Sequence, residues 1–378
     1  MKILTNIRFV KVAGIAQTLS SFINFIEQSK SNRVKIVGVD LAAAGQSREK
    51  CRQTKGNFSL VFRHLVIPSI NDVIKSAVTI EDVAKSYEPI ITAYQNIIKK
   101  QRPDVILING TYYMPWCLLR ASFDFSIPTI IHYHGSITKE TEHWQQAGHR
   151  ELFRFMERQF DNPKMFYIFP SNLTRELVEN DIFGHRVKKY SILPNPVPFY
   201  FFKAKPSGCR HRVGIVGRWA QVKNVDFINQ LAQYNAKSGG KFSLQIVSDR
   251  AARRGLNLNL SNLATFKRPM DNEKLVGFYA SLGVLISPSH FETYGNVPKE
   301  ALASGVPALI SPHMGVAETF KKLGLHDWIV DFISVRKVYA KIKEIAGQPV
   351  PANVRAELLE QYGTEPIYGK MLNIIQSV

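Results

Sequence analysis

The stretch VLISPSHFETYGNVPKEALASG, residues 284–305, has the pattern of a buried strand, a polar turn and the start of a helix. Its first four residues suit a strand, and Pro298 has the fixed φ angle that suits a first helical turn. Between them, Gly295 lets the backbone approach a ligand closely, and the amides that open a helix have no partners within it. Glu292 and Glu300 flank this turn. The stretch therefore predicts a phosphate-binding turn with a carboxylate on either side.

Short apolar segments alternate with longer segments of helical period along the whole chain, which is typical of parallel sheets covered by helices. The segments predicted as strands are 2–7, 34–39, 60–67, 105–109, 129–134, 165–170 and 190–193, and, in a second series, 212–216, 242–247, 264–266, 284–287, 308–310 and 328–330. The segments predicted as helices are 14–29, 80–101, 116–125, 141–160 and 172–180, then helices that start near 224, 272, 298, 316 and 335.

The two series are separated by PNPVPFYFFKAKPSG, residues 194–208, whose four prolines remove backbone donors and disfavour helix. A chain of 378 residues is also longer than one hydrophobic core usually supports. We therefore expect an α/β fold with two Rossmann-like, doubly wound domains over 1–197 and 198–352. Terminal helices over 353–378 are expected to pack back towards the first domain. Ligands of such folds bind at the carboxyl ends of the strands.

Composition argues against several classes of protein. The three cysteines, Cys51, Cys117 and Cys209, show no paired metal-ligand spacing, which fits a reducing compartment and disfavours a disulfide scaffold or a zinc site. Arg8 and Lys11 interrupt the segment where a secretory signal would have to be apolar. No apolar run approaches the ~18 residues of a membrane-spanning helix. We expect a cytoplasmic protein.

The net charge of +19 is shared almost equally by the two halves of the chain and indicates an anionic partner. No zinc-finger, basic-zipper or RNA-binding signature accompanies it, so nucleic acid is disfavoured against a phosphate-bearing substrate or an anionic membrane. Basic residues beside aromatic ones in 199–205, and further basic residues in 47–56, would dock a peripheral protein on the inner face of a membrane. Ordinary solvated loops are the alternative, and the oligomeric state is not indicated.

A second strand-to-helix turn is predicted in VGIVGRWAQVKN, residues 213–224. The strand ends at Gly217, Arg218 follows it, and Lys223 stands just before a helix. Two cations five residues apart can converge on one anion at the free amides of a helix start. The alternative is a pair of solvated surface charges, but the glycine after a core strand favours a phosphate site that needs no metal.

These stretches together resemble the retaining glycosyltransferases of the large fourth family, which have the two-domain GT-B architecture. The stretch 284–305 is similar to their E-x7-E signature, and VGRWAQVKN is similar to their V-G-R-x4-K segment. ILPNPV, FPSNLTRELV and HMGVAE resemble further family segments, in the family's order. The resemblance extends over most of the chain and is strongest between residues 194 and 315.

The resemblance implies roles for the donor-side residues. Arg218 and Lys223 would neutralise the diphosphate of a nucleotide-sugar donor, a UDP- or GDP-sugar, while Glu300 would bind the ribose hydroxyls. Glu292 would contact hydroxyls of the transferred sugar. The complete set of residues implied to bind the donor is Gly14, Gly217, Arg218, Lys223, Glu292, Thr293, Tyr294, Gly295, Asn296, Val297 and Glu300.

The N-terminal domain would bind the acceptor, a glycan, glycolipid or polysaccharide precursor. Gly14 matches the glycine of the loop after the first strand, where the family brings donor and acceptor together. IIHYHGS matches the segment that carries a histidine near the sugar's primary hydroxyl, with His134 the first candidate and His132 the second. This chain departs from the family at Thr293 and Tyr294, and at Asn296, where a leucine is common, so a more polar sugar pocket is expected.

The predicted catalytic residues are Glu292, His134, Arg218 and Lys223, in a transfer that retains anomeric configuration and uses no cofactor. Charge that develops on the leaving phosphate would be stabilised by Arg218, Lys223 and backbone amides. Since the chain contains no Asp-x-Asp triplet, we expect metal independence. The alternatives are a nucleotide-sugar epimerase or a phosphorylase on the same fold, and a non-catalytic protein that binds carbohydrate or an anionic polymer.

Overall fold

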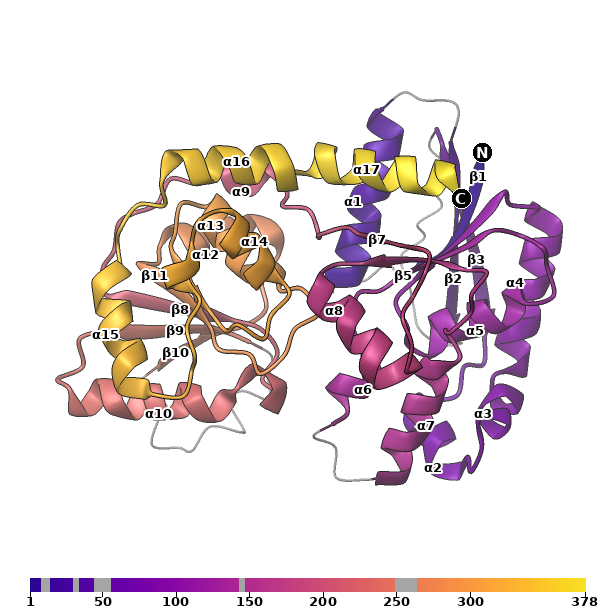
Figure 1. Cartoon of the computed structure of the whole chain (residues 1–378), viewed down its shortest axis with the longest axis horizontal. Helices are drawn as coiled ribbons and strands as arrows, with labels where there is room; N and C mark the ends of the chain where they lie inside the picture. Colours follow the sequence, from indigo (N-terminus) through magenta and orange to yellow (C-terminus); the bar gives the residue numbers. More distant parts are fainter. Residues whose placement is uncertain (8–13, 30–33, 44–55, 143–146, 249–263) are drawn as a thin grey trace. The chain divides into compact units, whose positions relative to one another are not determined.

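The computed structural model describes residues 1–7, 14–29, 34–43, 56–142, 147–248 and 264–378, without the side chains of 14–17, 42–43, 147–148 and 272. The chain divides into two compact units. Unit 1 comprises Met1–Leu193 and Tyr368–Val378, and unit 2 comprises Pro194–Ile367. Each unit is built around one parallel sheet (Figure 1).

Unit 1 contains a seven-stranded sheet in the order β3-β2-β1-β4-β5-β6-β7, and its strand pairs are parallel. Its strands are β1 (Lys2–Asn6), β2 (Lys35–Ala43), β3 (Phe58–Leu65), β4 (Val105–Asn109), β5 (Thr129–His132), β6 (Phe166–Phe169) and β7 (Tyr190–Ile192). Parallel strands covered on both faces are continuously apolar, and β4, with the sequence VILIN, is buried at every position. The strand order reverses between β1 and β4, which is the kind of position where doubly wound sheets bind ligands.

Helices cover both faces of this sheet (Figure 1). They are α1 (Gly14–Gln28), α2 (Ile70–Ser76), α3 (Ile80–Ser86), α4 (Glu88–Gln101), α5 (Tyr113–Ser122), α6 (Ile137–Glu140), α7 (Ala147–Arg158), α8 (Asn172–Leu177) and the π-helix η1 (Val178–Phe183). The predicted single helix over 80–101 is wrong, because the chain breaks at Tyr87 between α3 and α4. Pro89 has no N–H group to continue a helix from α3, and Tyr87 is fully buried at the break.

Unit 2 contains a five-stranded sheet in the order β10-β9-β8-β11-β12, again with parallel pairs. The strands are β8 (Arg212–Val216), β9 (Ser243–Val247), β10 (Ala264–Lys267), β11 (Val284–Ser287) and β12 (Ala308–Ile310). Its helical elements are α9 (Phe199–Phe202), η2 (Gln221–Lys223), α10 (Val225–Lys237), α12 (Asn272–Ala280), α13 (Asn296–Ala303), α14 (Val316–Lys322), η4 (His326–Trp328), α15 (Val335–Ile345) and α16 (Ala352–Tyr362). The switch point of this sheet lies between β8 and β11.

The strand predicted over 328–330 is wrong. The 3₁₀ helix η4 ends at Trp328, and Ile329 forms an isolated bridge to Ile310 in place of a ladder. This bridge includes the hydrogen bond from the Val330 amide to the Ile310 carbonyl, at 2.9 Å. The apolar pattern of this segment reflects contact with the core of unit 2, which includes Trp328.

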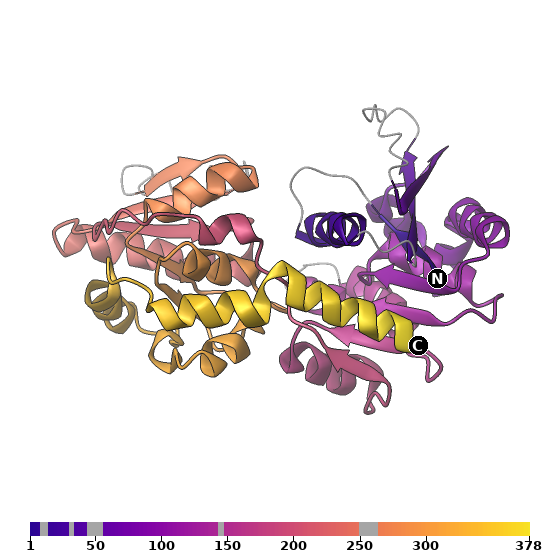
Figure 2. The same cartoon turned by 90° about the horizontal axis from the view of Figure 1, so that it is seen from above.

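The chain passes from unit 1 into unit 2 at Pro194 and returns at Tyr368, within α17 (Thr364–Ser377). The two connections lie side by side on unit 2, because the Val197 amide donates to the Tyr362 carbonyl at 2.7 Å. In unit 1, the Tyr368 hydroxyl donates to the Thr18 carbonyl at 2.7 Å and the Tyr368 ring packs on Phe22. The helix α17 is the yellow helix that ends at the C-terminus in Figure 2. The last helix therefore belongs partly to each unit.

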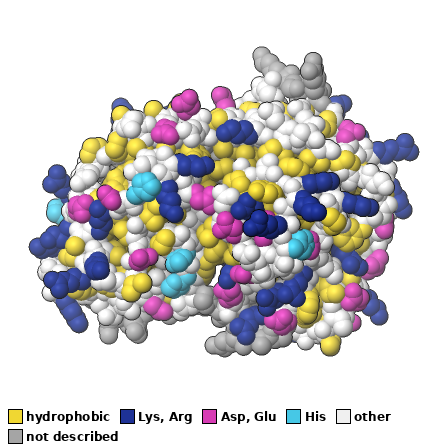
Figure 3. Space-filling view, viewed as in Figure 1, with side chains coloured by type: hydrophobic (Ala, Val, Ile, Leu, Met, Phe, Trp, Pro, Cys, Tyr) yellow, Lys and Arg dark blue, Asp and Glu magenta, His cyan; other side chains and the backbone are white. Residues whose placement is uncertain are grey.

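The basic composition of the chain can be followed on one face of the molecule. On the face drawn in Figure 3, lysine and arginine side chains lie over both units and are mixed with acidic ones. In the part of the chain that the structure describes, no helix combines the length and apolar character that crossing a membrane requires.

Candidate active site

The loops that follow β8 and β11 meet at the switch point of unit 2. Gly217, Arg218 and Trp219 leave β8, and Lys223 ends the short helix η2. These residues line one narrow hollow together with Ser287 and Ser289 from the end of β11. The His290 amide donates to the Val222 carbonyl at 2.8 Å and joins the two loops. The structure therefore brings Gly217, Arg218 and Lys223 together, as the sequence predicted.

Asn224 turns the chain from η2 into α10. It has φ of 56°, a left-handed conformation that asparagine adopts more readily than most residues, and its side chain accepts from the Phe227 amide at 3.3 Å. The asparagine thus caps α10 and ends η2 in one residue. This local geometry places Lys223 at the start of α10, facing the loop after β11.

Glu292 is fixed by contacts on both sides. Its Oε1 atom lies 2.7 Å from Lys223 Nζ and accepts a hydrogen bond from the Ser289 hydroxyl, also at 2.7 Å. Its backbone donates to the His313 carbonyl at 3.2 Å and accepts from the Gly315 amide at 3.0 Å. The side chain is 21% exposed, so the carboxylate is held in place yet accessible. Lys223 therefore joins the segment after β8 to the loop after β11.

Gly295 is required by the turn that opens α13. Its φ is 97°, and a Cβ atom at this position would lie 2.6 Å from Met314 Cε. Thr293 precedes this turn, and Tyr294 is buried, with its hydroxyl 2.8 Å from Thr319 Oγ1 on α14. Asn296 and Val297 are the first residues of α13, so their amides belong to the unpaired group at a helix start. The strand, turn and helix predicted from residues 284–305 are confirmed.

Glu300 lies one turn into α13 and accepts a hydrogen bond from the fully buried Tyr279 hydroxyl, at 2.8 Å. Burial raises the pKa of the Glu300 carboxyl, while the Tyr279 hydrogen bond and the neighbouring Lys299 oppose that shift. Glu300 is not among the residues that line the hollow with Arg218 and Lys223. Glu300 lies five residues after Gly295, and its Oε2 atom is held by the hydrogen bond from Tyr279 on α12.

In unit 1, His134 lies two residues beyond the end of β5, which is shorter than the predicted strand. Its Nε2 atom lies 3.4 Å from Asn109 Oδ1 at the end of β4, and its ring is 4.0 Å from the buried His132 ring. Burial lowers the pKa of His134 to about 4 and that of His132 well below its usual value. Both histidines are therefore neutral at physiological pH.

The remaining predicted positions lie largely beyond what the structure describes. Gly14 is the first residue of α1, but the preceding loop 8–13 and the surroundings of Gly14 lie outside the described residues. The basic segment 47–56 also falls outside them, apart from Gly56. In 199–205, the helix α9 buries Phe201 and leaves Phe199 55% exposed, with Lys203 Nζ 5.2 Å from the Phe199 ring centroid.

Sequence reasoning missed two fully buried charged residues, Glu157 on α7 and Lys299 on α13. A signal for Glu157 was present, because it falls on the stripe of buried residues formed by Phe153, Met156 and Phe160. A charged residue on such a stripe must find polar partners inside the fold. Lys299 gives the same signal among the buried residues of α13.

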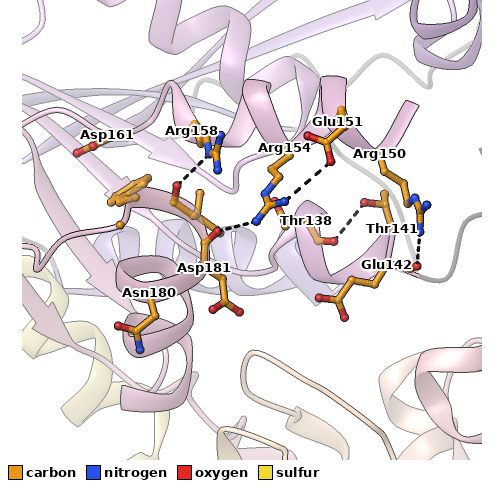
Figure 4. A pocket seen from close by; sticks show the side chains of 13 residues that line it. Thr138, Thr141, Glu142, Arg150, Glu151, Arg154, Arg158, Asp161, Asn180 and Asp181 are labelled. Atoms are coloured by element: carbon orange, nitrogen blue, oxygen red, sulfur yellow. Dashed lines mark hydrogen bonds and ion pairs between the residues drawn. The ribbon is translucent and has the colours of Figure 1, made fainter. Parts of the chain in front are cut away.

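Unit 1 also has a wide surface hollow of about 840 Å³ between α6, α7 and η1. Arg150, Arg154 and Arg158 face it from α7 (Figure 4). Arg154 and Arg158 donate to backbone carbonyls of η1, at 3.4 and 3.2 Å, and acidic side chains line the other walls. Three arginines thus face four carboxylates, and Arg154 and Arg158 join α7 to η1.

Solved structures define the class of the fold. Sucrose-phosphate synthase from Thermosynechococcus elongatus superposes with a TM-score of 0.76 at 17% identity, covering 100% of this chain and 99% of that one. A trehalose-6-phosphate protein from E. coli, bound with UDP-2-fluoro glucose, superposes with a TM-score of 0.68 at 11% identity, over 100% and 99% of the two chains. The two parallel-sheet units have the GT-B fold of glycosyltransferases.

Sequence comparison identifies the family. The model of "Glycosyl transferases group 1" matches residues 198–362, and that of "Glycosyltransferase Family 4" matches residues 71–199. The chain belongs to the fourth family of glycosyltransferases. A GDP-mannose-dependent alpha-mannosyltransferase of Corynebacterium glutamicum is 25% identical over 64% of this chain and 59% of its own length. A D-inositol 3-phosphate glycosyltransferase of Acidothermus cellulolyticus is 26% identical over 49% and 45%. The matched region thus spans about half of these relatives.

Proposed function

We propose that this protein transfers a hexose from a nucleoside-diphosphate sugar to an acceptor hydroxyl, with retention of anomeric configuration and without a metal. The observation that carries the proposal is the cluster at the switch point of unit 2. Arg218 and Lys223 share one hollow there, and Lys223 contacts Glu292 beside the turn that opens α13. Membership of the fourth glycosyltransferase family supports the same reaction class.

Cleavage of the bond between sugar and diphosphate leaves negative charge on the β-phosphate. In the proposed reaction, Arg218, Lys223 and the amides at the start of α13 stabilise this charge as it develops. The Lys223 ammonium, 2.7 Å from Glu292, would lie between this carboxylate and the diphosphate, and it has three donors to share. Because two side-chain cations and a helix start supply the positive charge, the proposed leaving group needs no metal ion.

The two carboxylates have separate proposed roles. Glu300 accepts hydrogen bonds from the ribose hydroxyls, with its other oxygen held by Tyr279 at 2.8 Å. Glu292 accepts hydrogen bonds from hydroxyls of the transferred sugar and favours positive character at the anomeric carbon. The acceptor hydroxyl would attack from the side of the leaving group, and the departing phosphate would take its proton. On this route Glu292 forms no covalent bond to the sugar.

We assign acceptor binding to unit 1, with His134 close to the reacting sugar. A neutral imidazole suits contact with a hydroxyl, and burial keeps His134 neutral by lowering its pKa. The relatives named for GDP-mannose make a GDP-sugar the first donor to test, with UDP-sugars second. The proposed acceptor is a glycan or lipid-linked precursor of a polysaccharide, and the exposed Phe199 beside Lys203 makes anionic lipid a proposed docking surface.

Product analysis with sugar-labelled GDP and UDP donors, without added metal, tests the proposal. A transferase moves the label to an acceptor alcohol, whereas an epimerase leaves it on the nucleotide and a phosphorylase moves it to inorganic phosphate. Arg218→Ala should slow label transfer by about 10²–10³-fold, while Arg336→Ala, at an exposed arginine on α15, should not. A chain that binds glycans but transfers no label from any donor would be a binding protein.

A further inference from the structure

Glu157 is a fully buried carboxylate that the proposed reaction does not use directly. It projects from α7, where its neighbours Phe153, Met156 and Phe160 are buried and apolar. A carboxylate without partners in such a place costs a large free energy, so its contacts reveal why it is tolerated. These contacts all lie at the carboxyl ends of two inner strands of the seven-stranded sheet, β4 and β5.

The carboxylate of Glu157 joins two loops. Its Oε2 atom accepts hydrogen bonds from the Thr138 backbone amide, at 2.8 Å, and from the Ser136 hydroxyl, at 3.2 Å. Both donors lie in the segment after β5. Its Oε1 atom lies 3.4 Å from the Thr111 hydroxyl, in the segment after β4. Thr111 in turn lies 3.2 Å from the Gly135 carbonyl. Glu157 therefore holds the segments after the two strands together.

His134 lies in the segment after β5 that Glu157 holds. It directly precedes Gly135, and its Nε2 atom lies 3.4 Å from Oδ1 of Asn109, two residues before Thr111. The Asn109 backbone is fixed independently, because its amide donates to Asn6 Oδ1 at 2.8 Å and its carbonyl accepts from Asn6 Nδ2 at 3.0 Å. The end of β4 is thus anchored to β1, and Glu157 fixes the loop after β5 to that anchor.

We infer that Glu157 is a positioning residue, which sets the place of His134 by joining the loop after β5 to the loop after β4. The inference rests on the proposed function, because His134 matters to the reaction only if unit 1 presents it to a sugar. Glu157 itself touches no reacting group. Its removal should therefore reduce turnover and leave nucleotide binding by unit 2 unchanged.

The chemistry of the site makes glutamine a suitable rescue. Burial raises the pKa of Glu157 to about 7, against hydrogen bonds that lower it, so both the neutral and the ionised form occur near neutral pH. In the Glu157→Gln variant, the introduced amide oxygen could accept from the Thr138 amide, and the introduced NH₂ group could donate to a threonine or serine oxygen. In Glu157→Leu, the introduced side chain has a similar volume and no polar atom, so it breaks all three contacts without leaving a cavity.

The test compares Glu157→Leu and Glu157→Gln with Glu151→Gln, a control on the exposed face of α7. In the label-transfer assay, Glu157→Leu should lower kcat by about 10- to 100-fold, the loss expected for a misplaced reacting group, with the donor KM unchanged. Glu157→Gln should recover most of the lost turnover, and the control should match the wild type. A kcat for Glu157→Leu close to wild type, or an equal loss for leucine and glutamine, overturns the inference.

A second measurement needs no activity and separates this inference from the proposed function. Hydrogen exchange of the Thr138 amide should be faster in Glu157→Leu and near the wild-type rate in Glu157→Gln, because Glu157 is its acceptor. Thr111→Val removes one hydroxyl and serves if Glu157→Leu does not fold. If wild-type protein transfers no label, the proposed function fails, while the exchange rates still decide whether Glu157 joins the loops. Unchanged exchange at Thr138 refutes the joining role.

Discussion

Replacement of Lys299 by methionine provides a quantitative test of how α13 is held. Lys299 is fully buried, and its Nζ donates to the Asn195 carbonyl near the connection between the units. The ammonium lies 4.3 Å from the ring centroid of Tyr294 and 5.6 Å from that of Tyr362. Among the described residues, no carboxylate lies within ion-pair distance of it. Lys299 thus links the donor-side helix to both chain connections of unit 2.

The opposing contributions at Lys299 nearly cancel. Burial of an ammonium costs several kcal/mol, and this cost lowers the pKa of Lys299 well below its usual value. A hydrogen bond from a charged donor returns about 1.5–3 kcal/mol, and a desolvated cation–π contact about 2 kcal/mol. Lys299→Met should therefore change the unfolding free energy of unit 2 by less than about 1 kcal/mol. Lys299→Ala should lose about 2–5 kcal/mol, because it leaves a cavity.

Urea unfolding, followed by hydrogen exchange of peptides from α13, measures unit 2 separately, since two-unit chains need not unfold in one step. Equal losses for methionine and alanine would refute this reasoning, because the charge itself would then be the stabilising feature. A large gain for methionine would show that the hydrogen bond to Asn195 contributes little.

The same variant tests the role of Glu300. The Lys299 charge lowers the pKa of Glu300, which burial raises above its usual value, so Lys299→Met should raise that pKa further. Ribose hydroxyls donate best to the ionised carboxylate, so protonation of Glu300 should weaken GDP and UDP binding. On acidification, this loss of affinity should begin at a higher pH in Lys299→Met than in the wild type. Affinities measured between about pH 5 and 8 check this shift. Identical pH profiles would contradict the assignment of Glu300 to the ribose.

Three further predictions concern the two sites. Arg218→Ala should lower kcat by about 10²–10³-fold, because the variant loses one of the charges proposed to stabilise the leaving phosphate. This loss corresponds to ~2.7–4 kcal/mol of transition-state stabilisation. A variant in which only KM changes would contradict the prediction. Gly295→Ala should weaken nucleotide binding in calorimetry by about 5- to 150-fold, because an alanine at φ of 97° costs about 1–3 kcal/mol and its Cβ would displace Met314 Cε. Wild-type affinity would contradict a phosphate-binding turn that requires glycine. Unit 1 should lose stability as pH falls from about 6.5 towards 4, because the lowered pKa of His134 keeps the folded side chain neutral while the unfolded one protonates. His134→Asn should reduce this loss when the unfolding free energy is measured with urea at several pH values. An unchanged dependence of the unfolding free energy on pH would refute the prediction.

The fold was predictable because the apolar runs of parallel strands leave a strong local signal. Residues 284–287, 105–109 and 212–216 form the strands β11, β4 and β8 with the predicted limits. Breaks that depend on tertiary contact were not predictable in the same way. The apolar run at 328–330 packs on the core as a 3₁₀ helix and a single bridge, and apolar character does not distinguish that from a strand.

The candidate site was predictable where its chemistry depends on short spacings. Arg218 and Lys223 lie five residues apart on one strand-to-helix turn, so local geometry alone brings them to one hollow. The contact of Lys223 with Glu292 joins loops about 70 residues apart and follows from the neighbouring positions of β8 and β11 in the sheet. The sequence carried a signal that Glu157 and Lys299 are buried. It could not predict their partners, which come from distant segments that only the fold brings together.

Calorimetric titration of the full chain with GDP and with UDP, in buffer that contains a metal chelator, tests the central claim most directly. We expect either GDP or UDP to bind. Its affinity should be at least about tenfold weaker for Arg218→Ala and for Lys223→Ala, because each variant loses a charge-assisted contact of about 1.5–3 kcal/mol. Arg336→Ala should bind as the wild type does. Failure of both nucleotides to bind, or equal affinity for Arg218→Ala and the wild type, would contradict a diphosphate site at the switch point of unit 2.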